Sequence, residues 1–186
     1  MERMLGWLRS RDHQLLMIAN RRPSHRALQT GLGTWLSTVT HMGGASFTLG
    51  TALLAALTGT AAWSIAGWQC IAAVAVSHLP VAVMKRRFRR LRPYQKLPNI
   101  NACRKPLQDS SFPSGHTTAV FAWLVPVMQL AGLSSAASLL MPAALLLGMS
   151  VAWSRMYLGL HYPSDVAAGA LLGSAAGAGA ITLLPL

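Results

Sequence analysis

Long stretches without a charged side chain alternate with short basic clusters along the chain. The first stretch runs from Ala27 to Met84 and contains no Asp, Glu, Lys or Arg. At about 1.5 Å per residue, a helical run of this length is enough for two crossings of a hydrocarbon layer of roughly 30 Å. The Gly and Thr residues of Leu57–Thr60 favour a turn near its middle. We therefore expect one membrane-spanning helix over 32–57 and a second over 61–84.

A second uncharged stretch and the C-terminal segment extend this pattern. Ser110 to Ser154 again lacks Asp, Glu, Lys and Arg, and Gly132 with the serines that follow it favours a turn. We expect three further helices over 113–131, 135–153 and 166–185. The sequence therefore predicts an all-α fold, a polytopic membrane helix bundle of about five transmembrane helices. An odd number of crossings places the two termini on opposite sides.

The first 26 residues differ from the rest because they are basic and lack a long apolar run. Arginines are spread throughout this segment, so we expect no signal peptide. Its apolar side chains recur at spacings that can share one face of a helix: Met4, Leu5, Leu8, Leu15, Leu16 and Ala19. We expect an interfacial amphipathic segment over 1–26 and a transmembrane catalytic domain over 27–186.

The composition supports a membrane protein and limits its partners. Hydrophobic residues make up 53% of the 186 residues and charged residues only 11%, whereas a soluble domain carries about a quarter charged residues. Soluble and disordered classes are excluded by these figures. The net charge of +12 lies in short clusters between apolar stretches. We therefore expect the bilayer and a phosphorylated lipid as partners, and no nucleic acid; the oligomeric state stays open.

Three polar clusters flank the predicted helices, and alternating crossings place them on one side of the membrane. They are Lys85–Pro93, Pro113–His116 and Ser154–Asp165. Ionisable residues at membrane depth are candidates for function. Lys85, Arg92 and Arg155 supply cationic donors for phosphate oxygens. Ser114 and Gly115 open a helix whose unpaired N–H groups favour an anion. The pattern predicts a site for phosphoryl transfer.

Two histidines and one carboxylate supply the reactive groups. His161 precedes Asp165 by four residues, which can bring the carboxylate to one ring nitrogen and leave the other free to attack phosphorus. Asp165 would then orient the ring, and His116 would protonate the leaving oxygen and activate water. A metal-bound His/His/Asp set is the rival, but abundant cations and a single carboxylate disfavour a divalent ion. We expect no metal and no other cofactor.

The three clusters resemble the motifs of a known family. Lys85–Pro93 fits K-x6-R-P, Pro113–His116 is P-S-G-H, and Ser154–Asp165 fits S-R-x5-H-x3-D. Together they resemble the type 2 phosphatidic acid phosphatase (PAP2) superfamily. The resemblance implies that His161 is a nucleophile forming a phosphohistidine, with Asp165 as its partner and His116 as general acid and base. It also implies a phosphate cradle of Lys85, Arg92, Ser114, Gly115 and Arg155.

The same resemblance implies a metal-independent membrane lipid phosphatase. The expected substrate is a phospholipid of the phosphatidic acid or phosphatidylglycerol phosphate type. An undecaprenyl or other isoprenyl diphosphate phosphatase with an extracytoplasmic site is the alternative. A non-enzymatic protein that binds anionic lipids would account for the arginines but not for His116, His161 and Asp165. A haloperoxidase-like enzyme would need vanadate as its cofactor.

The basic residues lie on the side of the membrane that carries the predicted site. The segment before Ala27, the loop Lys85–Asp109 and the connection Ser154–Asp165 together contain all 16 Lys and Arg residues. By the positive-inside rule, the N-terminus and the active site face the cytoplasm. We therefore expect an integral protein of the bacterial cytoplasmic membrane whose site is open to lipids of the inner leaflet.

Several polar residues outside the motifs are expected to have other roles. Four arginines next to Lys85 are expected to bind solvent or lipid headgroups rather than substrate: Arg86, Arg87, Arg89 and Arg90. His41 and His78 are expected to pack within the bundle, and Asp109 is expected to cap or position its loop.

Overall fold

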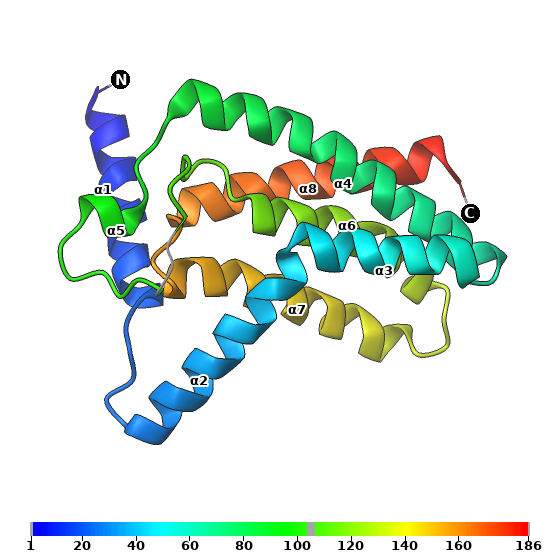
Figure 1. The fold of residues 1–186 in the computed structure, drawn as a ribbon, viewed down its shortest axis with the longest axis horizontal. Helices are drawn as coiled ribbons and strands as arrows, with labels where there is room; N and C mark the ends of the chain where they lie inside the picture. The colour runs from blue at the N-terminus through cyan, green and yellow to red at the C-terminus, as the bar shows by residue number, and fades with distance from the viewer. Residues whose placement is uncertain (1, 104–106, 186) are drawn as a thin grey trace.

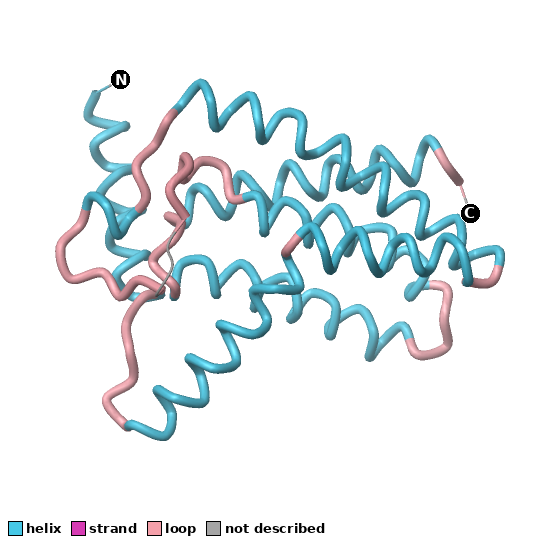
Figure 2. Tube along the Cα trace, viewed as in Figure 1, coloured by secondary structure: helices cyan, strands magenta, loops and turns pink. Residues whose placement is uncertain are grey.

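The structure, a computed structural model, describes residues 2–103 and 107–185, and this part of the chain is helical without strands (Figure 2). The elements in chain order are α1 (Glu2–Ala19), α2 (Arg26–Val39), the 3-10 helix η1 (Thr40–Gly43), α3 (Ala45–Thr58), α4 (Ala61–Phe88), α5 (Pro93–Lys96), α6 (Gly115–Gly132), α7 (Ala137–Tyr157) and α8 (Pro163–Leu183). Helices α3, α4, α6, α7 and α8 run alternately up and down one long axis (Figure 1). The expected all-α fold is confirmed.

Most predicted spanning helices lie within a few residues of their expected bounds. The helices expected over 61–84, 113–131, 135–153 and 166–185 correspond to α4, α6, α7 and α8. Local chemistry fixes their starts: the Ser114 side chain caps α6 by accepting from the Thr117 N–H. Pro163 stands at the start of α8, where its missing N–H costs no helical hydrogen bond.

The prediction of one continuous helix over 32–57 is wrong. The chain leaves α2, passes through η1 and takes an extended conformation at Gly44 before α3 begins. Helix α2 therefore diverges from the bundle, while α3 runs along it (Figure 1). The Gly43–Gly44 pair permits this break, and tertiary packing requires a glycine there, because a Cβ on Gly43 would lie 2.8 Å from the carbonyl oxygen of His116. The break packs η1 directly against the first turn of α6.

Helix α6 lies at the centre of the bundle and contacts α4, α7 and α8. Helix α8 approaches it through three glycines spaced four residues apart: Gly169, Gly173 and Gly177. A Cβ on Gly173 would lie 2.3 Å from the carbonyl oxygen of Thr118, so the two backbones touch. This close packing holds the starts of α6 and α8 side by side.

Three helical stretches of the described residues are long and apolar enough to cross a membrane. They are Ala61–Lys96, which contains α4, Ala137–Tyr157 and Pro163–Leu183. Helix α3 has only 14 residues, so the count of about five crossings stays a prediction. The N-terminus and α5 lie at one end of the bundle and the C-terminus at the other (Figure 1).

Helix α1 packs against the end of the bundle where α7 ends and α8 begins. Its buried face carries Asp12 and Leu16, and the buried Asn20 directly follows its last residue. Exposed apolar side chains on α1 include Trp7, Leu15 and Ile18. The predicted apolar residues Met4, Leu5 and Leu8 have side chains outside the described residues. The interfacial role of this segment stays a prediction.

Candidate active site

The three sequence clusters meet at the end of the bundle where α4 ends and α6 and α8 begin. The backbone N–H of Ser114 donates to the carbonyl oxygen of Asp165 at 3.0 Å. Nδ1 of His161 lies 2.7 Å from the carbonyl oxygen of Ser111. Nη1 of Arg92 lies 3.1 Å from Nε2 of the same histidine. The structure thus brings residues from all three clusters into contact.

His161 is buried in the short loop between α7 and α8. A carbonyl oxygen only accepts, so Nδ1 carries the proton shared with Ser111, and Nε2 keeps its lone pair in the neutral ring. Burial lowers the pKa of His161 to about 4, against the opposing effect of Asp165 and with a further lowering by Arg155 and Arg92. The ring is therefore neutral near pH 7, and the Nε2 lone pair, which accepts from Nη1 of Arg92 in this structure, has the character of a nucleophile.

Asp165 is fully buried in the first turn of α8. Its Oδ2 accepts hydrogen bonds from the Ser111 hydroxyl and the Tyr162 N–H, and lies 3.7 Å from Nδ1 of His161. The Nδ1–H of His161 therefore donates to the Ser111 carbonyl oxygen. It does not donate to the Asp165 carboxylate, which the spacing in the sequence had indicated as its partner. The carboxylate remains close enough to stabilise a positively charged ring through space.

The cations of the first motif are paired with an acid. Nε and Nη2 of the buried Arg92 donate to the backbone oxygen and Oδ1 of Asp109, at 2.9 and 2.7 Å. Nζ of Lys85 lies 2.5 Å from Oδ2 of Asp109. Burial raises the pKa of Asp109, but the hydrogen bonds from Lys85 and Arg92 outweigh it and lower that pKa to about 2. The ionised Asp109 carboxylate therefore pairs with Lys85 and Arg92, the two cations that were predicted to bind phosphate.

Arg155, near the end of α7, is buried without such a partner. Its Nη1 donates to the hydroxyl of Thr40 at 2.7 Å. Its Nε and Nη2 are buried and have no hydrogen-bond partner among the described residues. Burying charged donors without acceptors is costly, so these two nitrogens favour an anion. Thr40 belongs to η1, the break in the first predicted span, which sequence analysis did not find.

The first turn of α6 lies next to these groups. The Ser114 hydroxyl pairs with the Thr117 hydroxyl at 2.9 Å while capping the helix. A Cβ on Gly115 would meet no atom within 4 Å, so the backbone there is open to a ligand. His116 is half-buried and packs against Gly43 of η1. The free N–H groups of a helix start favour an anion at this point.

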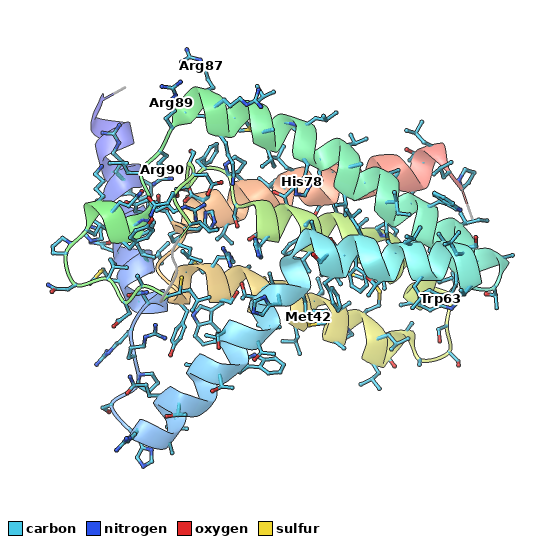
Figure 3. All side chains as sticks on the ribbon, in the orientation of Figure 1. Met42, Trp63, His78, Arg87, Arg89 and Arg90 are labelled. Carbon is cyan, nitrogen blue, oxygen red and sulfur yellow. The ribbon has the colours of Figure 1, made fainter. Side chains whose placement is uncertain are left out.

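A basic cleft of about 400 Å³ opens beside Asp109. Its charged lining residues are Lys85, Arg86, Arg89, Arg90 and Asp109. Figure 3 shows Arg87 and Arg89 at the outer edge of the end of α4 and Arg90 between this end and α1. The cleft therefore surrounds the Asp109 carboxylate with cations on the surface of the protein.

Two predictions for polar residues are wrong. Arg90 is not a free surface residue, because its Nη1 donates to Oδ1 of Asp165 at 2.7 Å and its Nη2 to Oδ2 of Asp12 at 2.6 Å. His41 is exposed on η1 and does not pack within the bundle. His78, by contrast, lies within hydrogen-bond distance of the Val74 carbonyl in its own helix.

The acidic residues Asp12 and Asp109 lie at the site beside Asp165, although the sequence analysis placed only Asp165 there. The chain has only four acidic residues beside 16 Lys and Arg. Three of the four, Asp12, Asp109 and Asp165, converge on this site, each within 2.7 Å of an arginine nitrogen. In this chain, these few acidic residues therefore coincide with the site.

The residues of the site favour an anion over a metal. Among the described residues, no group of three His, Cys, Asp or Glu side chains is placed to hold a metal ion. The carboxylates of Asp12, Asp109 and Asp165 are each paired with a cation, whereas Arg155 keeps two nitrogens without a partner among the described residues. Chemistry without a metal stays a prediction for this site.

The sequence matches the PAP2 superfamily over residues 66–185. A decaprenylphosphoryl-5-phosphoribose phosphatase of Mycobacterium tuberculosis is 38% identical over 116 residues, which cover 62% of this chain and 58% of that protein. This chain therefore spans less than two thirds of that relative's length.

Two solved structures share the fold. The crystal structure of Aquifex aeolicus LpxE has a TM-score of 0.75 at 22% identity and covers 91% of this chain and 93% of its own. The second structure is a transmembrane PAP2 type phosphatidylglycerolphosphate phosphatase from Bacillus subtilis. It has a TM-score of 0.76 at 23% identity, and the match covers 95% of this chain and 85% of that one. These likenesses cover most of the chain and therefore extend beyond residues 66–185 of the family match.

Proposed function

Because the chain belongs to the PAP2 superfamily, we propose that it is an integral-membrane phosphatase that removes the terminal phosphate of a lipid through a phosphohistidine at His161. The observation that carries this proposal is the buried guanidinium of Arg155, with two nitrogens that have no partner among the described residues. A phosphate group supplies the acceptors that these donors lack.

The first chemical step is attack of Nε2 of His161 on phosphorus. The bond between phosphorus and the lipid oxygen breaks, and His116 donates a proton to that leaving oxygen. Arg155 and the N–H groups at the start of α6 stabilise the charge on the phosphoryl oxygens. Asp165, 3.7 Å from Nδ1, stabilises the positive charge that develops on the ring.

The second step releases phosphate and restores the enzyme. His116, now neutral, takes a proton from water while the water oxygen attacks phosphorus. The bond between phosphorus and Nε2 breaks, and the neutral ring of His161 returns with its proton on Nδ1. No redox change occurs, and the sum is hydrolysis of one phosphate ester.

A phospholipid of the phosphatidic acid or phosphatidylglycerol phosphate type is our first candidate substrate. It follows from the proposed cytoplasmic orientation, which rests on all 16 Lys and Arg residues lying on the side of the site in the predicted topology. A prenyl-linked phosphate is the second candidate, because the Mycobacterium tuberculosis relative is named for a decaprenyl lipid. The apolar helices suit either tail, since both place the phosphate at the membrane surface.

A substrate panel tests this proposal. The full-length protein in detergent is given phosphatidic acid, phosphatidylglycerol phosphate, a prenyl-phosphoryl sugar phosphate and undecaprenyl diphosphate, with excess chelator present. We expect phosphate release from at least one lipid, and an acid-labile, alkali-stable phosphoprotein that His161→Ala cannot form. Release that needs added Mg²⁺, or that persists in His161→Ala, would contradict the mechanism.

Cysteine labelling of intact cells tests the orientation. A cysteine placed at Asn99, in the loop that carries the site, should resist a membrane-impermeant reagent if the site is cytoplasmic. Labelling at that position, together with protection of the C-terminus, would reverse the orientation and favour the prenyl substrate.

A further inference from the structure

Helix α1 contributes a carboxylate that touches the polar network around Asp165. Asp12 is buried on the docked face of α1. Its Oδ1 accepts from the Ser164 N–H at 2.8 Å. Its Oδ2 accepts from the Ser164 hydroxyl at 2.7 Å and from Nη2 of Arg90 at 2.6 Å. The start of α8 and the segment after α4 are therefore both tied to α1 through one side chain.

Arg90 joins this carboxylate to the catalytic one. Its Nη1 donates to Oδ1 of Asp165 at 2.7 Å, while its Nη2 donates to Asp12. The guanidinium plane also lies 3.9 Å from the ring centre of Tyr162. A planar fork held at two carboxylates and one aromatic face has a single orientation, which a lysine ammonium cannot reproduce.

This contact is one of three hydrogen bonds that orient the Asp165 carboxylate. With Oδ1 held by Arg90, Oδ2 is directed to the Ser111 hydroxyl and the Tyr162 N–H, on the side of His161. We infer that Asp12 and Arg90 are positioning residues for the reaction: Asp12 fixes Arg90, and Arg90 fixes the carboxylate that supports the nucleophile. The inference rests on the proposed function and assigns α1 a role in turnover beyond membrane attachment.

Helix α1 has a separate anchor that does not touch the site. The Asn20 side chain donates to the carbonyl oxygens of Asn101, Met156 and Tyr157 at 2.9 to 3.2 Å, and accepts from the Asn101 N–H at 2.8 Å. Docking of α1 and orientation of Asp165 are therefore carried by different residues. This separation provides a matched control.

The test compares variants of the full chain in detergent against the lipid that the wild type hydrolyses best. Asp12→Asn keeps the shape of the side chain but removes its charge, and Arg90→Lys keeps the charge but removes the fork. We expect kcat to fall about ten- to a hundredfold in each, because small misplacement of a reacting group has effects of this size. We expect KM and the inhibition constant of vanadate to stay within about twofold.

Three further variants separate positioning from stability. Asp12→Glu should recover part of the kcat lost in Asp12→Asn. Asn20→Ala should lower the melting temperature and leave kcat, measured well below that temperature, within about twofold of wild type. Gln14→Ala, on the exposed face of α1, should change neither. If Asp12→Asn does not fold, Arg90→Lys carries the same comparison.

The outcomes distinguish this inference from the proposed function. An inactive wild type on every lipid would remove the proposed function itself. An active wild type with unchanged kcat in Asp12→Asn and Arg90→Lys would overturn the positioning role alone. The positioning role is also overturned if Asn20→Ala, at a similarly lowered melting temperature, loses as much kcat as these two variants.

Discussion

The site has two halves, and the arginine in each half has a different kind of partner. In the paired half, Arg92 and Lys85 share the carboxylate of Asp109. In the open half, built by η1, the end of α7 and the start of α6, Arg155 has Thr40 as its partner and two nitrogens without one among the described residues. In the paired half the anion is the Asp109 carboxylate of the protein itself. In the open half the two nitrogens of Arg155 can donate to an anion that binds from outside. A phosphate group that binds Arg155 therefore competes with Asp109 for the donors of the paired half.

His116 in the open half gives the largest expected effect. Its removal should lower kcat on a lipid by about 10² to 10⁴-fold, because a positioned acid contributes that much when the leaving oxygen needs a proton. With p-nitrophenyl phosphate, whose leaving group needs no proton, His116→Ala should lose far less in the first step. Burst kinetics with both substrates check this, and equal losses would mean that His116 is not the acid.

Arg155→Lys should give the next largest effect. A point charge cannot reproduce a planar fork on phosphoryl oxygens, so we expect kcat to fall roughly 10² to 10³-fold, as for loss of one transition-state donor. Thr40→Val is the control, since it keeps the guanidinium and removes only its 2.7 Å hydrogen bond. Wild-type kinetics in Arg155→Lys would show that phosphate does not bind in the open half.

Asp109→Asn should have a smaller effect in the opposite direction. The Asp109 side chain is 52% exposed, so its pairing is weakened by solvent and is worth about 1 kcal/mol. Removing its charge frees Lys85 and Arg92, and vanadate should then inhibit about fivefold more tightly. Weaker inhibition would mean that Asp109 aligns these cations for phosphate and does not compete with it.

The last expected effect is on stability in mild acid and not on catalysis. The His161 pKa is lowered from 6.5 to about 4 in the folded protein. Below pH 6.5, His161 is protonated in the unfolded chain but stays neutral in the folded chain down to about pH 4. The free energy of unfolding therefore falls as pH falls through this window. The change is roughly 3 kcal/mol at about 1.4 kcal/mol per pKa unit.

Melting temperatures in detergent between pH 7.5 and 4.5 measure this dependence. His161→Gln, which keeps a polar side chain but cannot titrate, should show a flatter profile than wild type over the same range. Parallel profiles for the two proteins would mean that folding does not lower the pKa of His161.

Much of the fold follows from local sequence signals. The uncharged runs and the breaks at Gly59 and Gly132 locate α4, α6, α7 and α8, because lipid tolerates only helices with their backbone groups paired. The first predicted span fails at the Gly43–Gly44 pair, a local turn signal that the prediction passed over in favour of the long uncharged run. The close approach of η1 to the carbonyl of His116 makes use of this break.

The sequence by itself determined which residues form the three motifs and that they lie at one end of a membrane bundle, since both depend on residue type and spacing alone. The tertiary structure decided which partner each charge has. Arg90 meets Asp12 and Asp165, and Arg92 meets Asp109, while Arg155 meets only a hydroxyl among the described residues. Residues far apart in the chain form these pairs, because a buried charge is stable only beside a partner that packing of whole helices brings to it.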